Sequence, residues 1–492
     1  MNQDHIIQKV FIEITVNNKE KALSLKDDVN SFLSIDVFPQ IEKYINALEY
    51  KLAGQTLQIP TLELNVDVKS SALNTELKDK IAQVFKEELS EITKPIEDQN
   101  QFQNQNQEAK DTPLSYLMNS QEKLFQTFIH FLEKGSMPWW NSGSNNISIL
   151  ESVVFDQLIA ADNFQQKMVS VLSKEHVLNR IINQFSDEQI MQLCLAVLKN
   201  KELEIKIEEE TIYQIAKLNH KDKVILWQLI LNVISKSLNT SDKNNLREYL
   251  LQQISRIEQS GSRKIKANHN IGKTIVKIFP FIKIIDLKEN ETQENRQKST
   301  IDKSENINPQ TEAVYQNDLE VQEDTSQDEG LYIQNAGLIL IHPFIKPLFE
   351  DCNLLHPETR ELTDPELGAH LLHYIATGKT NAPECNMIFE KFLCNIPMHQ
   401  TINRHIKLSR KHKKQAKNVI ESVQHNWSSM KKSSAELLQN EFFQRSGKLV
   451  ITDYDYTVTI ERKTQDILLE KLSWGIGLIK LPWQEKFMYV NW

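Results

Sequence analysis

The abrupt change of composition at Gly330 constrains the fold of this 492-residue chain more than any other feature. Residues 286–330 carry four Lys and Arg against 13 Asp and Glu, so the formal charge of this segment, −9, equals that of the whole chain. Its few apolar residues cannot offset the entropy of ordering it, which predicts a disordered acidic linker. The dense apolar run of residues 330–355 predicts the start of a folded domain, residues 331–492.

Composition favours helices and a soluble protein. The chain has only 12 glycines, with 40% hydrophobic and 25% charged residues, which argues against a loop-rich or barrel-type enzyme. No apolar run approaches the roughly 18 residues that a membrane span needs, and no leader sequence begins the chain, so we expect a cytoplasmic protein. Outside the acidic linker the charges cancel, and we therefore expect no attraction of the folded parts to nucleic acid or anionic membranes.

Residues 1–97 are expected to form a small N-terminal α+β module. Apolar and other residues alternate over residues 5–16, which predicts a half-buried strand. Two helices follow, the second with Pro39 in its first turn. Alternation over residues 62–68 predicts another strand, and residues 73–93 another amphipathic helix.

The middle of the chain predicts a linker and a helical domain. Residues 98–112 are nearly all polar and predict a Gln/Asn-rich linker, whereas residues 113–285 have helical periodicity broken by short polar turns. The first of these helices stops at Gly135, and Trp139 and Trp140 follow. A glycine cap with two tryptophans packed under the next helix is the plainer interpretation, and tryptophans that anchor a partner protein are the alternative.

The C-terminal domain combines helices with a few terminal strands. Asp364 is expected to cap a helix that Gly378 closes, and a second helix is expected over residues 410–430. Ser433 and Glu436 fit a capping box.

From Lys448 the period changes to two, with the last strands at residues 478–483 and 487–492. The predicted fold class is therefore α+β and predominantly helical, ending in a few antiparallel strands. Trp474, Trp483 and Trp492 are expected to fill the sheet core, or to dock a partner if they are exposed.

The residues that could carry chemistry form no complete site. His370 and His373 lie one helical turn apart without an intervening glutamate, so a hydrogen-bonded structural role is favoured over metal binding. The four cysteines lack metal-ligand spacing and are expected to be buried thiols. We expect no catalytic residue, cofactor or metal. The basic cluster of residues 404–417 has no interleaved aromatic residue, which favours a solvated helix face over a nucleic-acid surface and leaves an acidic partner, or the acidic linker, as the alternative.

Several strings resemble one known family. They are LEL in the N-terminal module, FLEKGSMPWW before residue 141, HLLHYIATGK from His370, KFLCNIP from Lys391, HNWSSMKKSS, FFQRSGKL and KLSWGIGLIKLPWQEKFMYVNW. In this order they resemble the tape measure proteins of contractile injection systems, the phage-tail-like machines of bacteria. Ser473 and Gln484 stand where the family usually has proline and methionine, which concerns local turns only.

The resemblance implies a structural assembly protein that sets the length of the inner tube and sheath. It implies inner tube and baseplate hub proteins as partners, and a place in the assembling or assembled particle in the cytoplasm. Association between copies within the particle is left open. The alternatives are a protein that nucleates or caps the tube, or a helical adaptor that measures no length.

Overall fold

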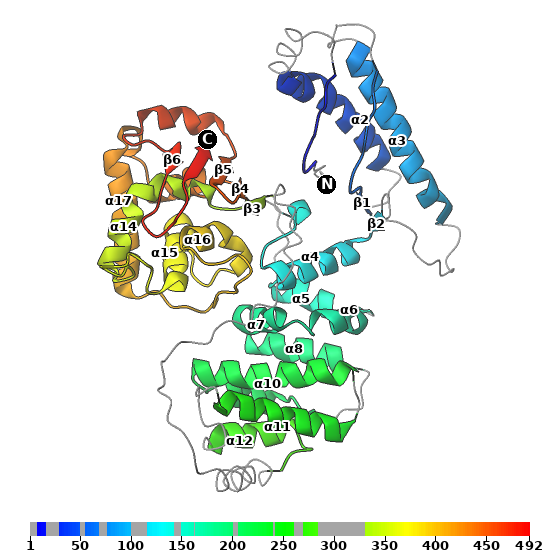
Figure 1. The fold of residues 1–492 in the computed structure, drawn as a ribbon, viewed down its shortest axis with the longest axis vertical. Helices are drawn as coiled ribbons and strands as arrows, with labels where there is room; N and C mark the ends of the chain where they lie inside the picture. The colour runs from blue at the N-terminus through cyan, green and yellow to red at the C-terminus, as the bar shows by residue number, and fades with distance from the viewer. Residues whose placement is uncertain are drawn as a thin grey trace, which may run out of the picture. The chain divides into compact units, whose positions relative to one another are not determined.

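The computed structural model describes residues 7–15, 29–49, 55–67, 76–99, 116–141, 149–161, 163–199, 205–239, 242–259, 269–283 and 330–492. These residues belong to two compact units, Met1–Gln126 and Thr127–Trp492. Helices dominate and strands are few, which confirms the predicted fold class (Figure 1). The finer boundaries expected at the two linkers stay predictions.

The first unit is built on two packed helices. Phe32, Ile41, Phe85 and Leu89 form its buried core. In its described residues the unit contains a π-helical turn, two α-helices and two short antiparallel strands: η1 (Leu33–Val37), α2 (Phe38–Glu49), β1 (Thr56–Gln58), α3 (Lys78–Gln99) and β2 (Tyr116–Met118).

The helices predicted on either side of Pro39 form one continuous helix over residues 29–49, while the start of the first lies outside the described residues. The π-helical turn η1 runs directly into α2 just before Pro39. Proline lacks the N–H that would bond to the carbonyl four residues earlier, and a wider turn accommodates the missing bond. Separate helices were therefore a wrong prediction.

The prediction of two strands in this unit, over residues 5–16 and 62–68, is also wrong for the residues that the structure describes. Residues 7–15 run as an extended segment, and residues 61–67 show alternating burial, but neither pairs with another described strand. Alternation specifies which face of a segment is buried, whereas a strand also needs a neighbouring edge to hydrogen-bond. Within the described part of this unit, the strands that form are β1 and β2.

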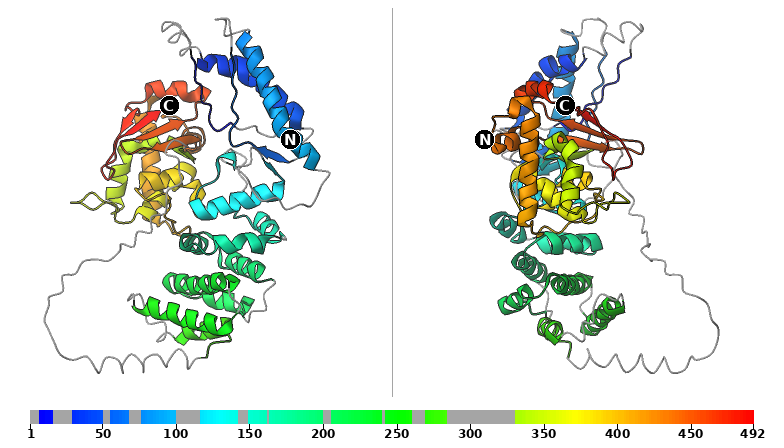
Figure 2. Two further views of the ribbon diagram at one scale, coloured as in Figure 1. Left: turned by 45° about the vertical axis from the view of Figure 1, so that its right-hand side comes forward. Right: turned by 90° about the vertical axis from the view of Figure 1, so that its left-hand side faces the viewer.

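The second unit begins with a run of helices, as predicted. Figures 1 and 2 show successive helices lying in layers. Ser186 accepts a hydrogen bond from the backbone N–H of Gln189, and Gln189 Oε1 accepts one from the backbone N–H of Ser186, so a capping box begins the helix at Asp187. The bounds are α4 (Ser120–Lys134, which begins in the first unit), α5 (Ser152–Ile159), α6 (Phe164–Val171), α7 (Glu175–Gln184), α8 (Asp187–Leu198), α9 (Glu209–Ala216), α10 (His220–Asn239), α11 (Lys243–Gln259) and α12 (His269–Ile278).

The C-terminal part of the second unit packs helices on one face of a five-stranded sheet. The strand order is β3-β4-β5-β7-β6, and β5 and β7 are parallel, so the sheet is mixed and not wholly antiparallel. The edge strand β3 was not predicted, because its three residues merge into the apolar run after Gly330. The strands are β3 (Leu331–Ile333), β4 (Gly447–Ile451), β5 (Tyr456–Ile460), β6 (Leu478–Ile479) and β7 (Met488–Asn491).

The helices of this part follow the predicted caps with one exception. Asp364 accepts a hydrogen bond from the backbone N–H of Leu367, and Gly378 ends that helix at a φ of 68°. The cap predicted at Ser433 is wrong, because Ser434 accepts the capping bond while Ser433 donates to the carbonyl of Met430. The helices are α14 (His342–Asp351), α15 (Pro365–Thr377), α16 (Ile388–Leu393), α17 (Arg410–Asn426) and α18 (Ala435–Leu438), with shorter turns η4 (Ala336–Ile341), η5 (Glu384–Asn386), η6 (Ser428–Met430), η7 (Gln439–Phe443) and η8 (Thr464–Lys471).

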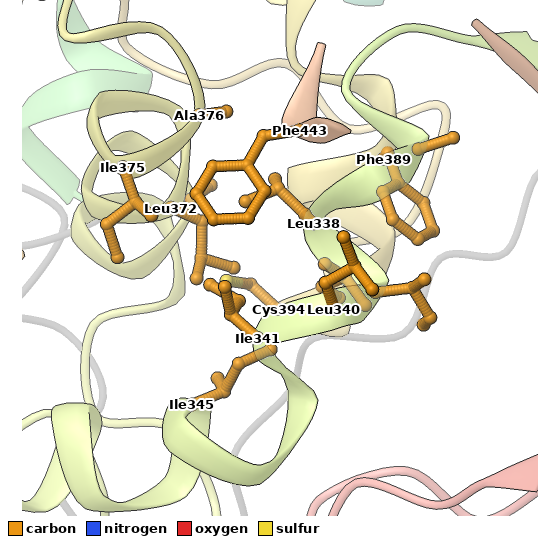
Figure 3. Packing of buried hydrophobic residues seen from close by; sticks show 14 of the residues in the cluster. Leu338, Leu340, Ile341, Ile345, Leu372, Ile375, Ala376, Phe389, Cys394 and Phe443 are labelled. Carbon is orange, nitrogen blue, oxygen red and sulfur yellow. The ribbon is translucent and has the colours of Figure 1, made fainter. Parts of the chain in front are cut away.

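The apolar run after Gly330 lies at the centre of this core. Leu338, Leu340 and Ile341 of η4 are fully buried, and Figure 3 shows them among side chains of α15 and Phe443 of η7. Gly337 allows the backbone of η4 to lie close to the backbone of η7, since an added Cβ would lie 1.6 Å from the carbonyl oxygen of Phe442. The backbone itself would have to move to admit any side chain there.

We expect Gly337→Ala to destabilise the protein by about 3 kcal/mol or more, because overpacking against backbone cannot be relieved by a rotamer change. Gly477→Ala is the matched control, since a Cβ there meets no atom within 4 Å. Urea unfolding followed by tryptophan fluorescence measures both. Equal stability of the two variants would contradict the close packing of η4 on η7.

Candidate functional site

The second unit buries a cluster of three charged side chains, which we call the Glu384 cluster. Arg180 of α7, Glu384 of η5 and Lys391 of α16 each have side chains 0% exposed. The Arg180 Nε lies 3.2 Å from Glu384 Oε2, and Lys391 Nζ lies 2.6 Å from Glu384 Oε1. One carboxylate therefore lies between two cations that come from parts of the chain about 200 residues apart.

Backbone carbonyls accept further hydrogen bonds from both cations of the Glu384 cluster. Arg180 donates through Nη1 to the carbonyl of Leu132 at 2.6 Å and through Nη2 to that of His399 at 2.9 Å. Lys391 Nζ donates to the carbonyls of Met398 at 3.1 Å and Gln400 at 2.5 Å, so each ammonium hydrogen has an acceptor. Burial lowers the pKa of Lys391, and the carboxylate of Glu384 opposes this effect.

Further hydrogen bonds at the end of α7 join the stacked helices to the C-terminal part. We call this contact, together with the Glu384 cluster, the joint. Gln184 donates through Nε2 to the carbonyl of Ile402 at 2.7 Å, and its Oε1 accepts from the backbone N–H of Glu384 at 2.8 Å. The backbone N–H of Arg404 donates to the carbonyl of Asn183 at 3.1 Å. The stacked helices and the C-terminal part are thus held together by a buried polar interface within one unit.

Gly135 is required beside the Glu384 cluster. It ends α4 at a φ of 78°, where its N–H donates to the carbonyl of Phe131, so the predicted glycine cap is confirmed. An added Cβ would lie 2.6 Å from Glu384 Oε1 and 3.0 Å from Arg180 Nη2. The string FLEKGSMPWW therefore supplies both the Leu132 carbonyl and the space that the carboxylate occupies.

A second buried polar group lies nearby on the same segment. Glu390 Oε1 lies 2.8 Å from His373 Nδ1 and accepts a hydrogen bond from Asn335 Nδ2 at 2.8 Å. Glu390 Oε2 is buried without a hydrogen-bond partner. Asn335 adopts a φ of 57°, which places its side chain toward this carboxylate.

The predicted structural role of His370 is confirmed, because its Nε2 lies 2.9 Å from the carbonyl oxygen of Asn403 in a buried setting. Among the described residues, no three His, Cys, Asp or Glu side chains are grouped as metal ligands would be. All four cysteines are buried, as predicted, and burial raises the pKa of each thiol. No helix in the described ranges combines the length and apolarity of a membrane span.

The three C-terminal tryptophans are anchored within their own domain. Their indole N–H groups donate to the carbonyl of Leu340 (from Trp474, 3.0 Å), to the carbonyl of Leu393 (from Trp483, 2.7 Å) and to Asp466 Oδ2 (from Trp492, 3.1 Å). Trp483 is buried, while Trp474 and Trp492 are half-buried. These positions match the expected core role, and partner binding by these tryptophans stays a prediction.

Trp139 and Trp140 occupy a short turn, η3 (Trp139–Asn141), and are half-buried. Their rings meet edge-on at 5.7 Å, and Trp140 packs edge-on on His130 of the preceding helix, α4, at 6.4 Å. The Trp140 Nε1 is buried without a hydrogen-bond partner. Trp140 thus contacts α4. The expected packing of the two tryptophans under the next helix and the partner-anchor hypothesis both stay predictions.

The basic cluster divides between two roles. Arg410, Lys411, Lys413 and Lys414 are exposed at the start of α17, as expected for a solvated helix face. The guanidinium of Arg404 instead donates to the carbonyls of Asn381 and Gln184 and belongs to the buried joint.

Sequence reasoning missed the Glu384 cluster entirely. One signal was present, because Glu390 and Lys391 interrupt an apolar helix, IFEKFL, where a charge needs a buried partner. No local pattern identifies Arg180 as that partner.

We expect Glu384→Gln to destabilise the protein by about 3–5 kcal/mol, because it leaves two buried cations without a counter-charge. The control is Glu421→Gln, the same chemical change in an exposed pair with Lys417 at 3.6 Å, which should cost less than about 1 kcal/mol. Urea unfolding of the full chain measures both. Similar losses would contradict the assignment of Glu384 as the balancing charge.

Histidine burial predicts loss of stability in acid. Burial, aided by Lys134 and opposed by Glu133, lowers the pKa of His130 to about 4. Between pH 6.5 and about 4 the unfolded chain binds a proton that folded His130 does not, so this contribution to stability is complete above pH 6.5 and is lost as the pH falls. His130→Gln should lose less stability over this range than the unaltered chain, as thermal unfolding at each pH would show. His425→Gln, at an exposed site on α17, should keep the full dependence, and an equal slope in all three proteins would refute the role of His130.

Comparison with known proteins identifies the family. The family model described as contractile injection system tape measure protein matches residues 4–492. No curated protein and no solved structure matches the chain. The match covers both compact units and all the strings that carried the resemblance. The chain belongs to the contractile injection system tape measure protein family.

Proposed function

We propose that this protein sets the length of the inner tube and sheath of a contractile injection particle, acting as a structural component without catalytic activity. The observation that carries the proposal is the family match over residues 4–492. We further propose that it contacts inner tube and baseplate hub proteins in the cytoplasm during assembly. The Glu384 cluster supports a structural role, because both of its cations are bonded to Glu384 inside the protein.

Length measurement requires the chain to extend. A fully helical chain of 492 residues would reach about 740 Å at about 1.5 Å per residue. The Glu384 cluster instead holds α7 against η5 and α16. Under this proposal the joint opens, wholly or in part, when the chain spans the growing tube.

The same joint favours a second function. If Arg180 and Glu384 stay paired during assembly, the protein remains compact and can nucleate or cap the tube without measuring it. Tube length would then depend on another component. The two functions differ in how tube length responds to chain length.

Graded insertions separate the two functions. We expect insertion of 40 residues into the region 286–330, or of whole helical turns into the region 149–279, to lengthen the particle in proportion. For 40 residues the increase is about 60 Å if they are helical and up to about 130 Å if they are stretched. Electron microscopy of the particles gives the length distribution.

The matched control is the same 40 residues appended after Trp492, beyond the last strand, where they need not lie within the measured span. If the protein measures length, the particle length changes with the internal insertions and much less with the appended residues. An unchanged length across the internal series, with assembly intact, would reject length measurement and favour nucleation or capping. Loss of all particles on deletion of the chain is expected under either function and does not separate them.

A further inference from the structure

The turn between β4 and β5, residues 451–455, presents an exposed aromatic side chain on a fixed backbone, and we call it the hairpin tip. Tyr454 is 88% exposed. The hydroxyl of Thr452 donates to Asp455 Oδ1 at 2.8 Å and accepts from the backbone N–H of Asp455 at 3.0 Å. Lys486 Nζ donates to the carbonyl of Thr452 at 2.8 Å and ties the tip to the segment before β7. A partner can therefore bind Tyr454 without first ordering the loop that carries it.

Acidic and apolar side chains lie beside this ring. Asp453 and Glu485 are exposed, and neither forms an ion pair with a described residue. Ile451 and Phe487 are exposed by 38% and 48%. The carbonyl of Phe487 accepts a hydrogen bond from the backbone N–H of Tyr456 at 2.9 Å, so these side chains lie at one end of the sheet. The hairpin tip thus combines exposed apolar groups with unpaired negative charge, as the centre and rim of a protein interface do.

The opposite charge lies unpaired at the start of α17. Arg410, Lys411 and Lys414, which we call the basic face, are exposed there, and none of them forms an ion pair with a described residue. The first turn of α17 contains no acidic residue. Cations at this end of a helix oppose its dipole, and Arg410 and Lys414 also repel each other at a spacing of four residues. An anionic partner would offset this unfavourable arrangement.

We propose that the hairpin tip of one copy of this chain docks on the basic face of a second copy. The carboxylates of Asp453 and Glu485 then lie against the cations of α17. The planar guanidinium of Arg410 is suited to stacking on the exposed ring of Tyr454. Each surface supplies the charge that the other lacks, which favours a second copy over an unrelated protein.

The fold excludes this contact within one copy. Both surfaces lie within residues 330–492, all of which the structure describes. Val423 of α17 and Leu449 of β4 are fully buried in the same core, and Figure 1 shows these two elements on different sides of the C-terminal part. Bringing the two surfaces together in one copy would break that core, whereas two copies meet without rearrangement.

The contact joins different surfaces of the two copies, so it is head-to-tail. It can repeat along a row of copies or close into a ring. This inference does not depend on the proposed length measurement.

Two charge-reversed full-length proteins test the contact by analytical ultracentrifugation. Asp453→Lys alters only the hairpin tip, and Arg410→Glu alters only the basic face. We expect each protein alone to self-associate about tenfold or more weakly than the unaltered chain. A mixture of the two should regain association, because one protein keeps the basic face and the other keeps the hairpin tip. Glu358→Lys, at an exposed site outside both surfaces, is the matched control and should associate as the unaltered chain does.

Ionic strength and a neutral substitution provide two further measurements. Association should weaken as the ionic strength rises from about 0.01 M to about 1 M, because the Debye length falls from about 30 Å to about 3 Å. Tyr454→Ala should weaken association about tenfold and leave the thermal unfolding curve unchanged, since the ring is exposed.

Four outcomes would overturn the proposal. The first is an unaltered chain that stays monomeric at low ionic strength, which would leave the hairpin tip to an unrelated protein. The others are equal association of Asp453→Lys and Glu358→Lys, a mixture of Asp453→Lys and Arg410→Glu that fails to associate, and a Tyr454→Ala protein that associates as strongly as the unaltered chain.

Discussion

The buried carboxylate of Glu384 is the constraint on which the second unit depends. Removing a carboxylate from water costs several kcal/mol unless charges and hydrogen bonds replace the solvent, and here Arg180 and Lys391 supply both. With two cations and one carboxylate, the Glu384 cluster has a net positive charge. The backbone carbonyl oxygens that accept hydrogen bonds from Arg180 and Lys391 offset this charge. The end of α4, the length of α7 and the loop after α16 must therefore all be in place before the carboxylate can be buried. A fold that misplaces any one of them leaves an uncompensated charge.

An ionic joint behaves differently from an apolar one when it opens. The core around Leu338 and Phe443 gains nothing from water on exposure, whereas Arg180, Glu384 and Lys391 recover their hydration. For that reason buried ion pairs contribute modestly to net stability while specifying one arrangement closely. If the chain extends in the particle, as proposed, the contact of α7 with η5 and α16 is one that can part without opening the apolar core of the C-terminal part.

The sequence predicted those features whose physics is local. The caps at Asp364 and Gly378 each involve groups within one helical turn, and the predictions at these residues were right. The Ser433 cap was wrong by one residue, since adjacent serines offer the same chemistry. The Glu384 cluster could not be predicted, because the separation of Arg180 and Glu384 by 204 residues carries no periodic signal. The prediction of strand pairing was wrong for the same reason. Alternation over residues 61–67 indicates which face of the segment is buried, but it does not indicate which strand the segment would hydrogen-bond to.

The second unit matches its buried charges internally, and this bears on assembly. The cations of the Glu384 cluster are bonded to Glu384 and to backbone carbonyls, so a partner protein that displaced one of these groups would leave a buried charge unpaired, at a cost of several kcal/mol. The physical chemistry therefore favours a fixed internal geometry in this unit, until a force large enough to part Arg180 from Glu384 acts on it.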